Sequence, residues 1–425
     1  MLAKRSKFLG IRNTNFRLVE KPVRYSRKGI SERVTYMRSK KIVIASFAAL
    51  GLAIASATAG VAASVPKVAM LKSLGKGEGA LNIIVWAGYA ENGSNDKTVD
   101  WVHPFTAATG CKVNARTAGT SDEMVSLMKT GGYDGVSASG DASLRLIYGG
   151  QVAPVNTALV PNYKTISPFL KKQTWNSVNG QMYGIPHGWG ANVLAYNAAK
   201  VKKPTSWSVV FDAKSPYKGQ ITAYDSPIYI ADAAMYLMST KPALKIKNPF
   251  SLDKTQLAAA VALLKVQKKN IGEYWSDYTK SVQSFESSNT LVGTSWQVIV
   301  NTINGDKKVK VDSTVPKEGA TGWSDTWMVS AKAQHPNCMY QWMNWITSPK
   351  INAQVAEYFG EAPAQTLACS HTVDKSFCTT YHATDAAYAK KIWYWTTPTT
   401  NCLDGRGNIC TDYATWTQAW TSIKG

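Results

Sequence analysis

Residues 292–329 have the sequence VGTSWQVIVNTINGDKKVKVDSTVPKEGATGWSDTWMV, which places an aspartate among three tryptophans in one strand–loop–strand unit: Trp296, Trp323, Asp325 and Trp327. Indole faces attract cations through their quadrupole, and a neighbouring carboxylate accepts charge-assisted hydrogen bonds from the same cation. Tryptophans are more often buried in a core. Residues 316–322, however, read as a turn, and turns carry sites more often than cores do. The stretch therefore favours an alkyl ammonium site.

The segments around this stretch predict an α/β fold. Residues 81–86 form a short apolar run typical of a buried strand, and Trp86 and Tyr89 lie at its end. Ligands of open α/β sheets bind beyond the carboxyl ends of the strands, so both aromatics are expected to face a cleft. Strands alternate with helices along the chain: strands at 111–117, 133–139 and 218–224, and helices at 97–109, 121–129 (capped by Ser121), 231–238 and 252–268.

Five segments between about Leu81 and about Gln365 resemble the periplasmic spermidine/putrescine-binding proteins, the solute receptors of polyamine ABC importers. They are LNIIVWAGY (81–89), YDGVSASG (133–140), YGIPHGWGANVLAYN (183–197), VPKEGATGWSDTWMVSAKA (315–333) and NAQVAEYFGEAPA (352–364). The resemblance implies an α/β, two-lobed periplasmic binding protein, type II-like, with a hinge between the lobes and a disulfide-bearing C-terminal extension. The expected division is a basic arm and signal peptide (1–64), the first part of lobe 1 (65–187), lobe 2 (188–322), and the return to lobe 1 with the extension (323–425).

The resemblance also implies a ligand site. Trp86, Tyr89, Trp296 and Trp323 would sandwich a methylene chain, and Asp325 would accept hydrogen bonds from an ammonium group. The family has two carboxylates one helical turn apart after the strand at 218–224. Here Ser226 and Tyr229 take those positions, and Asp225 comes one residue earlier. Both Asp225 and Tyr229 are expected in the site.

Two further acids stand where the family has aromatic residues. Asp141 either adds a carboxylate to the site or caps the next helix. Glu361 is either a second anchor for a cationic end or an ordinary loop acid. In the tail, residues 393–395 (WYW) either line the cleft or pack onto the first lobe, and packing is favoured.

Charge is concentrated at the N-terminus. The 425-residue chain has a formal net charge of +21, but residues 1–41 hold 13 Lys and Arg against 2 Asp and Glu. The remaining residues carry only +10 and show no basic stripe interleaved with aromatics, which excludes a nucleic-acid binder. Residues 42–64 form an uncharged apolar run after MRSKK, which predicts a signal peptide and a periplasmic location, with an uncleaved membrane anchor as the alternative.

Six cysteines in an exported chain predict disulfides: Cys111, Cys338, Cys369, Cys378, Cys402 and Cys410. Pairing Cys369 with Cys378 and Cys402 with Cys410 would close short loops. A zinc site formed by Cys369, His371, Cys378 and His382 is the rival interpretation.

The sequence therefore predicts a monomeric solute-binding protein that closes on a small cationic amine and delivers it to a membrane ABC permease. No cofactor or metal is expected. The alternatives are another solute, such as a quaternary amine, an amino acid derivative or a sugar, or an exported glycosidase that uses Asp225 and Asp325 as its carboxylate pair. An enzyme is disfavoured because neither a GxSxG nor an HExxH motif occurs. An amine site would depend on the charge of Asp325, whereas a sugar site would not.

Overall fold

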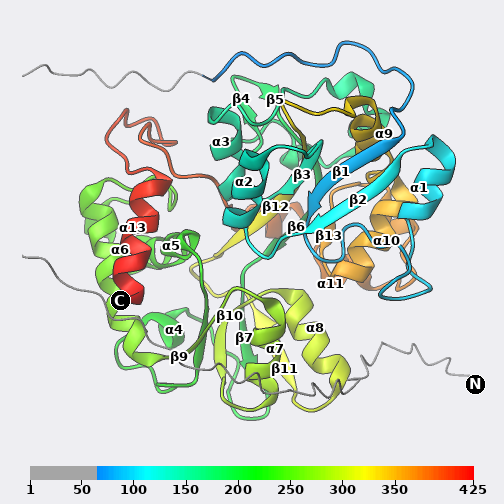
Figure 1. Cartoon of the computed structure of the whole chain (residues 1–425). Coiled ribbons are helices and arrows are strands. Elements are labelled where there is room, and N and C mark those ends of the chain that lie inside the picture. Colours follow the sequence, from blue (N-terminus) through cyan, green and yellow to red (C-terminus); the bar gives the residue numbers. More distant parts are fainter. Residues whose placement is uncertain (1–64) are drawn as a thin grey trace, which may run out of the picture. The chain divides into compact units, whose positions relative to one another are not determined.

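The structure is a computed structural model that describes residues 65–425 (Figure 1). Two main sheets organise these residues, one of seven strands and one of five. We call the seven-stranded sheet with its helices the first lobe, and the five-stranded sheet with its helices the second lobe. The basic arm and the predicted signal peptide lie outside the described residues. Among the helices that are described, none combines the length and the apolar character needed to cross a bilayer.

The first lobe has the strand order β13-β6-β12-β3-β1-β2, with β14 paired to β12. Its strands are β1 (Ala80–Val85), β2 (Lys112–Thr117), β3 (Gly135–Ala138), β6 (Ile185–Ala191), β12 (Ala320–Val329), β13 (Ala362–Pro363) and β14 (Ile392–Tyr394). Its helices are α1 (Val102–Thr109), α2 (Ser121–Thr130), α3 (Gly140–Tyr148), α9 (Pro336–Ile346), α10 (Pro349–Phe359), α11 (Phe377–Thr380) and α12 (Ala386–Ala389). A small hairpin, β4 (Ser177–Val178) and β5 (Gln181–Met182), lies beside it.

The second lobe has the strand order β11-β7-β10-β8-β9. Its strands are β7 (Val193–Asn197), β8 (Ile221–Tyr224), β9 (Ile271–Trp275), β10 (Val292–Ser295) and β11 (Val311–Thr314). Its helices are α4 (Ser208–Phe211), α5 (Ile230–Thr240), α6 (Lys254–Gln267), α7 (Tyr278–Glu286), α8 (Gln297–Asp306) and α13 (Tyr413–Lys424). Short 3-10 helices occupy Thr157–Leu159, Pro161–Thr165, Pro168–Leu170, Pro227–Tyr229, Pro242–Leu244, Lys268–Asn270 and Ala368–Ser370.

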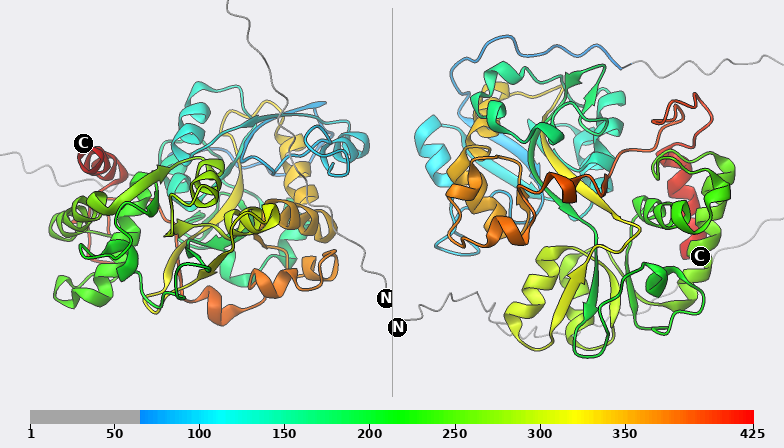
Figure 2. Two further views of the ribbon diagram at one scale, coloured as in Figure 1. Left: turned by 90° about the horizontal axis from the view of Figure 1, so that it is seen from below. Right: turned by 180° about the vertical axis from the view of Figure 1, so that it is seen from behind.

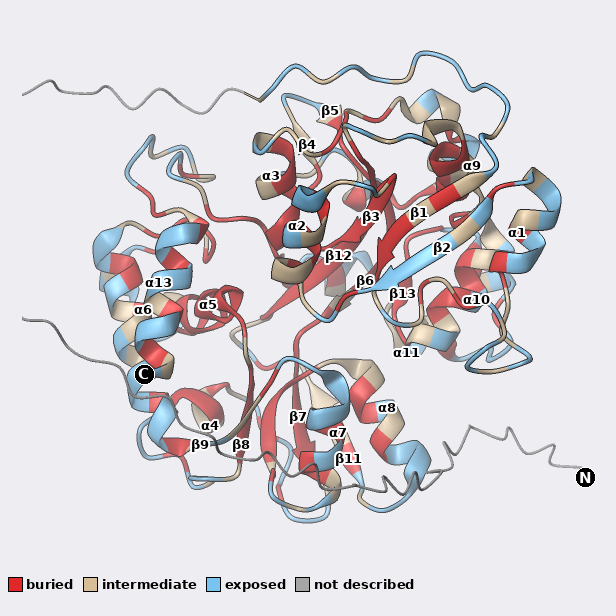
Figure 3. Ribbon diagram, viewed as in Figure 1, coloured by how far each residue is buried: buried red, intermediate tan, exposed pale blue. Residues whose placement is uncertain are grey.

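Burial follows the apolar pattern of the strands (Figure 3). Strand β12 is buried along its whole length and contacts α3, α5 and α9, whereas β2 is largely exposed at the sheet edge. One predicted cap is wrong. The cap of α2 is Thr120, whose hydroxyl accepts the Glu123 N–H at 3.1 Å. The hydroxyl of Ser121 is directed elsewhere, to Asp141 at 2.9 Å.

The chain passes between the two sheets twice. It leaves the first lobe at the end of β6 and enters the second lobe at β7 after the single residue Asn192. It returns through residues 315–319, which link β11 to β12. These crossings lie close to the predicted boundaries at 188 and 322, although the division into domains stays a prediction.

A third connection between the lobes comes from the C-terminal segment, residues 392–425 (Figure 2). Strand β14 pairs with the start of β12, and Ile392 and Tyr394 pack in the first lobe. Trp395 instead packs with the second-lobe core, as do Trp416 and Trp420 of α13. The expected packing of the tail onto the first lobe is thus only part of the arrangement, because its C-terminal half covers the second lobe.

All six cysteines form disulfides: Cys111–Cys338, Cys369–Cys378 and Cys402–Cys410. Both predicted short pairings are confirmed. The rival zinc site is wrong, because Cys369 and Cys378 are bonded to each other, and residues 65–425 contain no cluster of His, Cys, Asp and Glu able to hold a metal ion.

Candidate ligand-binding site

The middle of β12 lies at the junction of two strand pairings. Strand β14 pairs with Ala320–Gly322 and β3 pairs with Thr326–Val329 along one edge of β12, while β6 covers the other edge. Residues 323–325 therefore have no strand partner on the first edge among the described residues. Ser139, which follows β3, reaches across this opening and donates a 2.5 Å hydrogen bond to Asp325 Oδ1.

Two buried carboxyl groups meet at one tyrosine. The hydroxyl oxygen of Tyr89 lies 2.7 Å from Asp325 Oδ2 and 2.6 Å from Glu361 Oε2. A phenol carries one proton, so it can donate to only one of these oxygens, and the other contact needs a protonated carboxyl. Burial raises the pKa of Glu361 well above its usual range and that of Asp325 to about 6. Glu361 is therefore the group that holds a proton at neutral pH.

A third buried carboxyl belongs to the same cluster. Burial, with smaller contributions from the charges of Asp122 and Asp325, raises the pKa of Asp141 to about 7, against the lowering effect of the Ser121 hydrogen bond and the Arg145 charge. Asp141 lies within α3, after the cap position held by Ser139, and its side chain accepts from Ser121. The interpretation of Asp141 as a helix cap is therefore wrong.

None of these three carboxyls forms an ion pair with a lysine or arginine of residues 65–425. His187 Nε2 lies 3.4 Å from Glu361 Oε1, but burial lowers the pKa of His187 to about 3, so the ring is neutral at physiological pH. Arg145 is bonded to Asp122 at 2.7 Å instead. We call Asp141, Asp325 and Glu361 the acid cluster. None of its members forms an ion pair with a lysine or arginine of the described residues, although the charge of Arg145 lowers the pKa of Asp141.

Aromatic rings adjoin the acid cluster. Trp323 and Trp296 lie with ring centroids 6.5 Å apart, and Trp296 donates to Asn192 at 2.9 Å. Tyr224 lies 5.6 Å from Trp296 and stacks on Trp395 at 5.7 Å. The predicted pair Trp296 and Trp323 is thus brought together, in contact with the second-lobe strand that ends at Tyr224.

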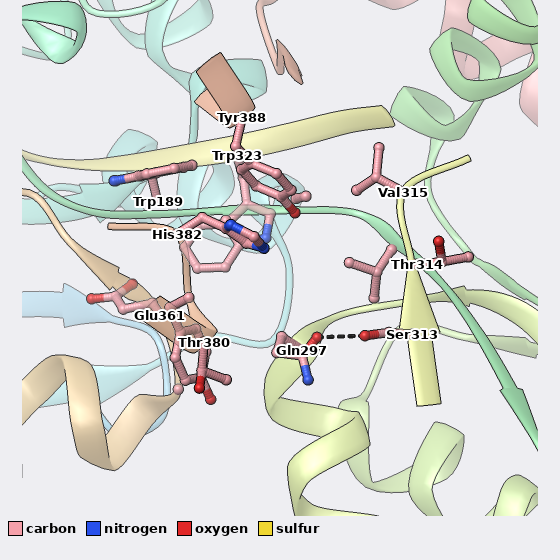
Figure 4. A pocket seen from close by; sticks show the side chains of 15 residues that line it. Trp189, Gln297, Ser313, Thr314, Val315, Trp323, Glu361, Thr380, His382 and Tyr388 are labelled. Atoms are coloured by element: carbon pink, nitrogen blue, oxygen red, sulfur yellow. Dashed lines mark hydrogen bonds between the residues drawn. The ribbon is translucent and has the colours of Figure 1, made fainter. Parts of the chain in front are cut away.

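A cavity of about 270 Å³ borders Glu361 and Trp323 (Figure 4). Trp189 and Glu361 lie on one side and Ser313 on the opposite side, where its hydroxyl donates to Gln297 at 2.6 Å. Residues 380–388, which follow the Cys369–Cys378 loop, form another wall. The volume is sufficient for a small solute and below the usual range of drug-sized pockets.

Glycines in β6 make room for two site residues. A Cβ atom at Gly188 would lie 2.0 Å from the Glu361 carboxyl carbon, and one at Gly190 would lie 2.7 Å from the Trp323 ring. These two glycines therefore allow β6 to pack closely against the site.

Three predicted site residues have other surroundings. Asp225 accepts from Trp420 Nε1 at 3.0 Å and from Lys424 Nζ at 2.9 Å. Tyr229 is buried in the second-lobe core and accepts from Gln267 at 2.9 Å. Trp86 is partly buried against two first-lobe clusters. Sequence reasoning missed Ser139, Asn192 and Tyr224. The available signal was that Ser139 and Tyr224 end the strands predicted at 133–139 and 218–224.

The acid cluster predicts how stability depends on pH. Each group has a folded-state pKa above its ordinary value, so unfolding releases protons between about pH 4 and the folded-state pKa of each group, which is about 6 for Asp325, about 7 for Asp141 and well above the ordinary value for Glu361. Stability is therefore fully present below about pH 4 and is lost as the pH rises through the folded-state values. From Asp141 and Asp325 alone, we expect the protein to be on the order of 4 kcal/mol less stable at pH 8 than at pH 5. Urea midpoints at the two pH values measure this, and equal midpoints would contradict it.

Comparison with known proteins agrees with the geometry. Residues 100–373 match the sequence model of a family described as bacterial extracellular solute-binding protein. The putrescine-binding periplasmic protein SpuD of Pseudomonas aeruginosa is 26% identical over 275 residues, covering 61% of this chain and 72% of that protein. The spermidine/putrescine-binding periplasmic protein of Escherichia coli is 24% identical over 301 residues, covering 66% and 81%.

Solved structures share the fold. The spermidine/putrescine ABC transporter substrate-binding protein PotD of Streptococcus pneumoniae superposes with a TM-score of 0.63 at 18% identity, covering 81% of this chain and 99% of that one. A spermidine/putrescine ABC transporter protein of Listeria monocytogenes gives 0.66 at 18% identity, covering 82% and 99%. The two-lobed fold class is thereby confirmed, as is a binding protein rather than an enzyme. Because the family match spans well over half of its length, the chain belongs to the bacterial extracellular solute-binding proteins.

Proposed function

We propose that the protein is the extracytoplasmic receptor of an ABC importer and that its solute is a small alkyl amine. The observation that carries this proposal is the acid cluster, three buried carboxyls with no lysine or arginine partner in the described chain. The polyamine-binding relatives make putrescine and spermidine the reference ligands.

A bound ammonium would neutralise the negative charge of the buried carboxylates in the acid cluster. It would let Glu361 release its proton and would donate hydrogen bonds to Asp325 and Glu361, each contributing about 1.5–3 kcal/mol. The faces of Trp296 and Trp323 would add about 0.5–2 kcal/mol per cation–π contact. Together these contributions amount to about 4–10 kcal/mol before the costs of association and ordering, and micromolar affinity corresponds to about 8 kcal/mol.

Delivery follows from the two lobes. Tyr89 and the acid cluster belong to the first lobe, whereas Trp296 and Tyr224 belong to the second. A solute held between them would favour the closed arrangement, which a membrane permease could then recognise. The leader at 42–64 would direct the chain to the periplasm, and both relatives are named as periplasmic proteins. A monomer remains the expected state.

Amine affinity should rise with pH. Asp325 and Asp141 ionise at about 6 and about 7, so the site gains negative charge between pH 5.5 and 7.5 while the alkyl amine stays protonated. We expect putrescine to bind about fivefold more tightly at pH 7.5 than at pH 5.5. Calorimetry on residues 65–425 measures the affinity, and paired buffers with different ionisation heats report the proton released. Neutral sugars serve as controls, and sugar binding without amine binding would overturn the proposal.

A further inference from the structure

The acid cluster is one-sided. Its members come from α3, from the middle of β12 and from the residue preceding β13, and all three elements belong to the first lobe. Tyr89 and Ser139, which hold Asp325 and Glu361 by hydrogen bonds, also come from the first lobe. The negative charge that would meet an ammonium is therefore gathered at one end of the site.

In the second lobe, the acids that follow strands β8 and β9 already have hydrogen-bond partners within the protein. Asp225, at the end of β8, is held by Lys424 and Trp420 of α13, which lies beyond the residues that match the family. Asp277 follows β9 and caps α7, where it accepts the Thr279 N–H at 2.8 Å. The C-terminal helix α13 thus occupies the carboxylate of Asp225, the acid nearest to the positions where the family has two carboxylates for an amino group.

Two further acids lie near the crossing. Glu318 accepts from Ser206 and from the Trp207 N–H. The other is Asp232. It is buried and accepts from Thr321 at 2.9 Å, and Thr321 in turn accepts from Asn192 at 2.7 Å. Asn192 then accepts from Trp296. Asp232 is therefore separated from the aromatic wall by a chain of three hydrogen bonds, and it meets β12 at the crossing rather than the ring of Trp296.

What the aromatic residues offer instead is hydrogen-bond donors. The indole N–H groups of Trp323 and Trp395 are buried and have no acceptor among the described residues. The side chains themselves are 6% and 3% exposed, so bulk water does not satisfy them. An ammonium group is a donor only, so it would leave both indoles unsatisfied, whereas a hydroxyl or carbonyl oxygen would satisfy one.

We infer that the solute has one ammonium group, held by the acid cluster, and carries at its other end a hydrogen-bond acceptor in place of a second ammonium. This inference rests on the proposed function and narrows it. It assigns the recognition of an uncharged, oxygen-bearing end to the indoles of Trp323 and Trp395, which pack against the second-lobe core. The C-terminal helix, which engages Asp225, then distinguishes this receptor from one selective for diamines.

Three probes of equal chain length test the inference on residues 65–425: 1,4-diaminobutane, 4-amino-1-butanol and 1,4-butanediol. We expect 4-amino-1-butanol to bind at least tenfold more tightly than the diamine, because burying a second ammonium without a carboxylate is strongly unfavourable. The diol, which lacks an ammonium, should not bind. Calorimetry at pH 7.5 gives all three affinities.

The outcomes separate the two proposals. A diamine that binds as tightly as the amino alcohol, or more tightly, would overturn the inference and leave the amine-receptor function standing. A diol that binds as well as the amino alcohol, or failure of both amines to bind, would overturn the proposed function itself. Asp225→Asn tests whether Asp225 takes part in binding. The ratio of the affinities for the diamine and the amino alcohol should stay within twofold of the ratio for the parent protein. A larger change would place Asp225 in the site and overturn the inference.

Discussion

Asp325→Asn is expected to weaken amine binding by tenfold to a hundredfold. The substitution keeps the size of the side chain but removes the charge that faces the ammonium, and a hydrogen bond to a charged group contributes about 1.5–3 kcal/mol. The pKa of Asp325 is about 6, against about 7 for Asp141, so Asp325 is the carboxylate that is mostly ionised at pH 7. Its loss therefore removes most of the negative charge of the site.

The fold should tolerate this change. The introduced amide would retain one oxygen to accept from Ser139 or Tyr89, and a buried carboxyl with a raised pKa would be gone. Calorimetric titration with 4-amino-1-butanol and putrescine measures the affinity loss, and urea unfolding confirms the fold. Asp225→Asn is the control and should retain affinity within twofold. If Asp325→Asn and Asp225→Asn lost amine affinity equally, Asp325 would not be the carboxylate that binds the ammonium group.

Removing the Cys111–Cys338 disulfide is expected to have the largest effect on stability. This bond joins the residue before β2 to α9 across 227 positions, whereas the other two disulfides span nine and eight. Loop-closure entropy grows with the logarithm of loop length, which gives on the order of 5 kcal/mol for the long loop and about 2.5 kcal/mol for a short one.

The matched comparison is between two double variants, Cys111→Ala with Cys338→Ala and Cys402→Ala with Cys410→Ala. Urea midpoints of each against the parent protein give the two losses in stability. A loss from the short loop that equals or exceeds that from the long loop would show that native packing, rather than restriction of the unfolded chain, sets the stabilisation.

Strand-end positions explain what the sequence could predict of the site. Tyr89 follows a strand that the apolar run at 81–86 predicts, and Asp325 lies in the predicted strand–loop–strand unit at 292–329. Their meeting with Glu361 depends on the strand order of the sheet, which the sequence did not reveal. The short disulfides were predictable, since proximity along the chain implies proximity in space. The pair Cys111–Cys338 needs α9 packed beside the start of β2, which no local pattern reveals.

The surroundings of Asp225 could not be predicted. Its position after a strand is as favourable as that of Asp325, and the difference lies in residues almost 200 positions away. Lys424 and Trp420 reach Asp225 only because α13 packs on the second lobe through Trp416 and its neighbours. A tail without resemblance to known segments gives no sequence signal for such a contact.

The C-terminal segment also bears on how quickly the receptor exchanges its solute. Arg145 of α3 lies over the ring of Tyr413 in α13 at 4.2 Å, and Thr397 donates its N–H to Gly140 O at 3.1 Å. These contacts join the lobes in this structure without any contribution from a solute, so they are expected to lower the free energy that a solute must supply for closure. They must also break before the lobes separate. We therefore expect the segment to favour a long residence time and slow release of the solute.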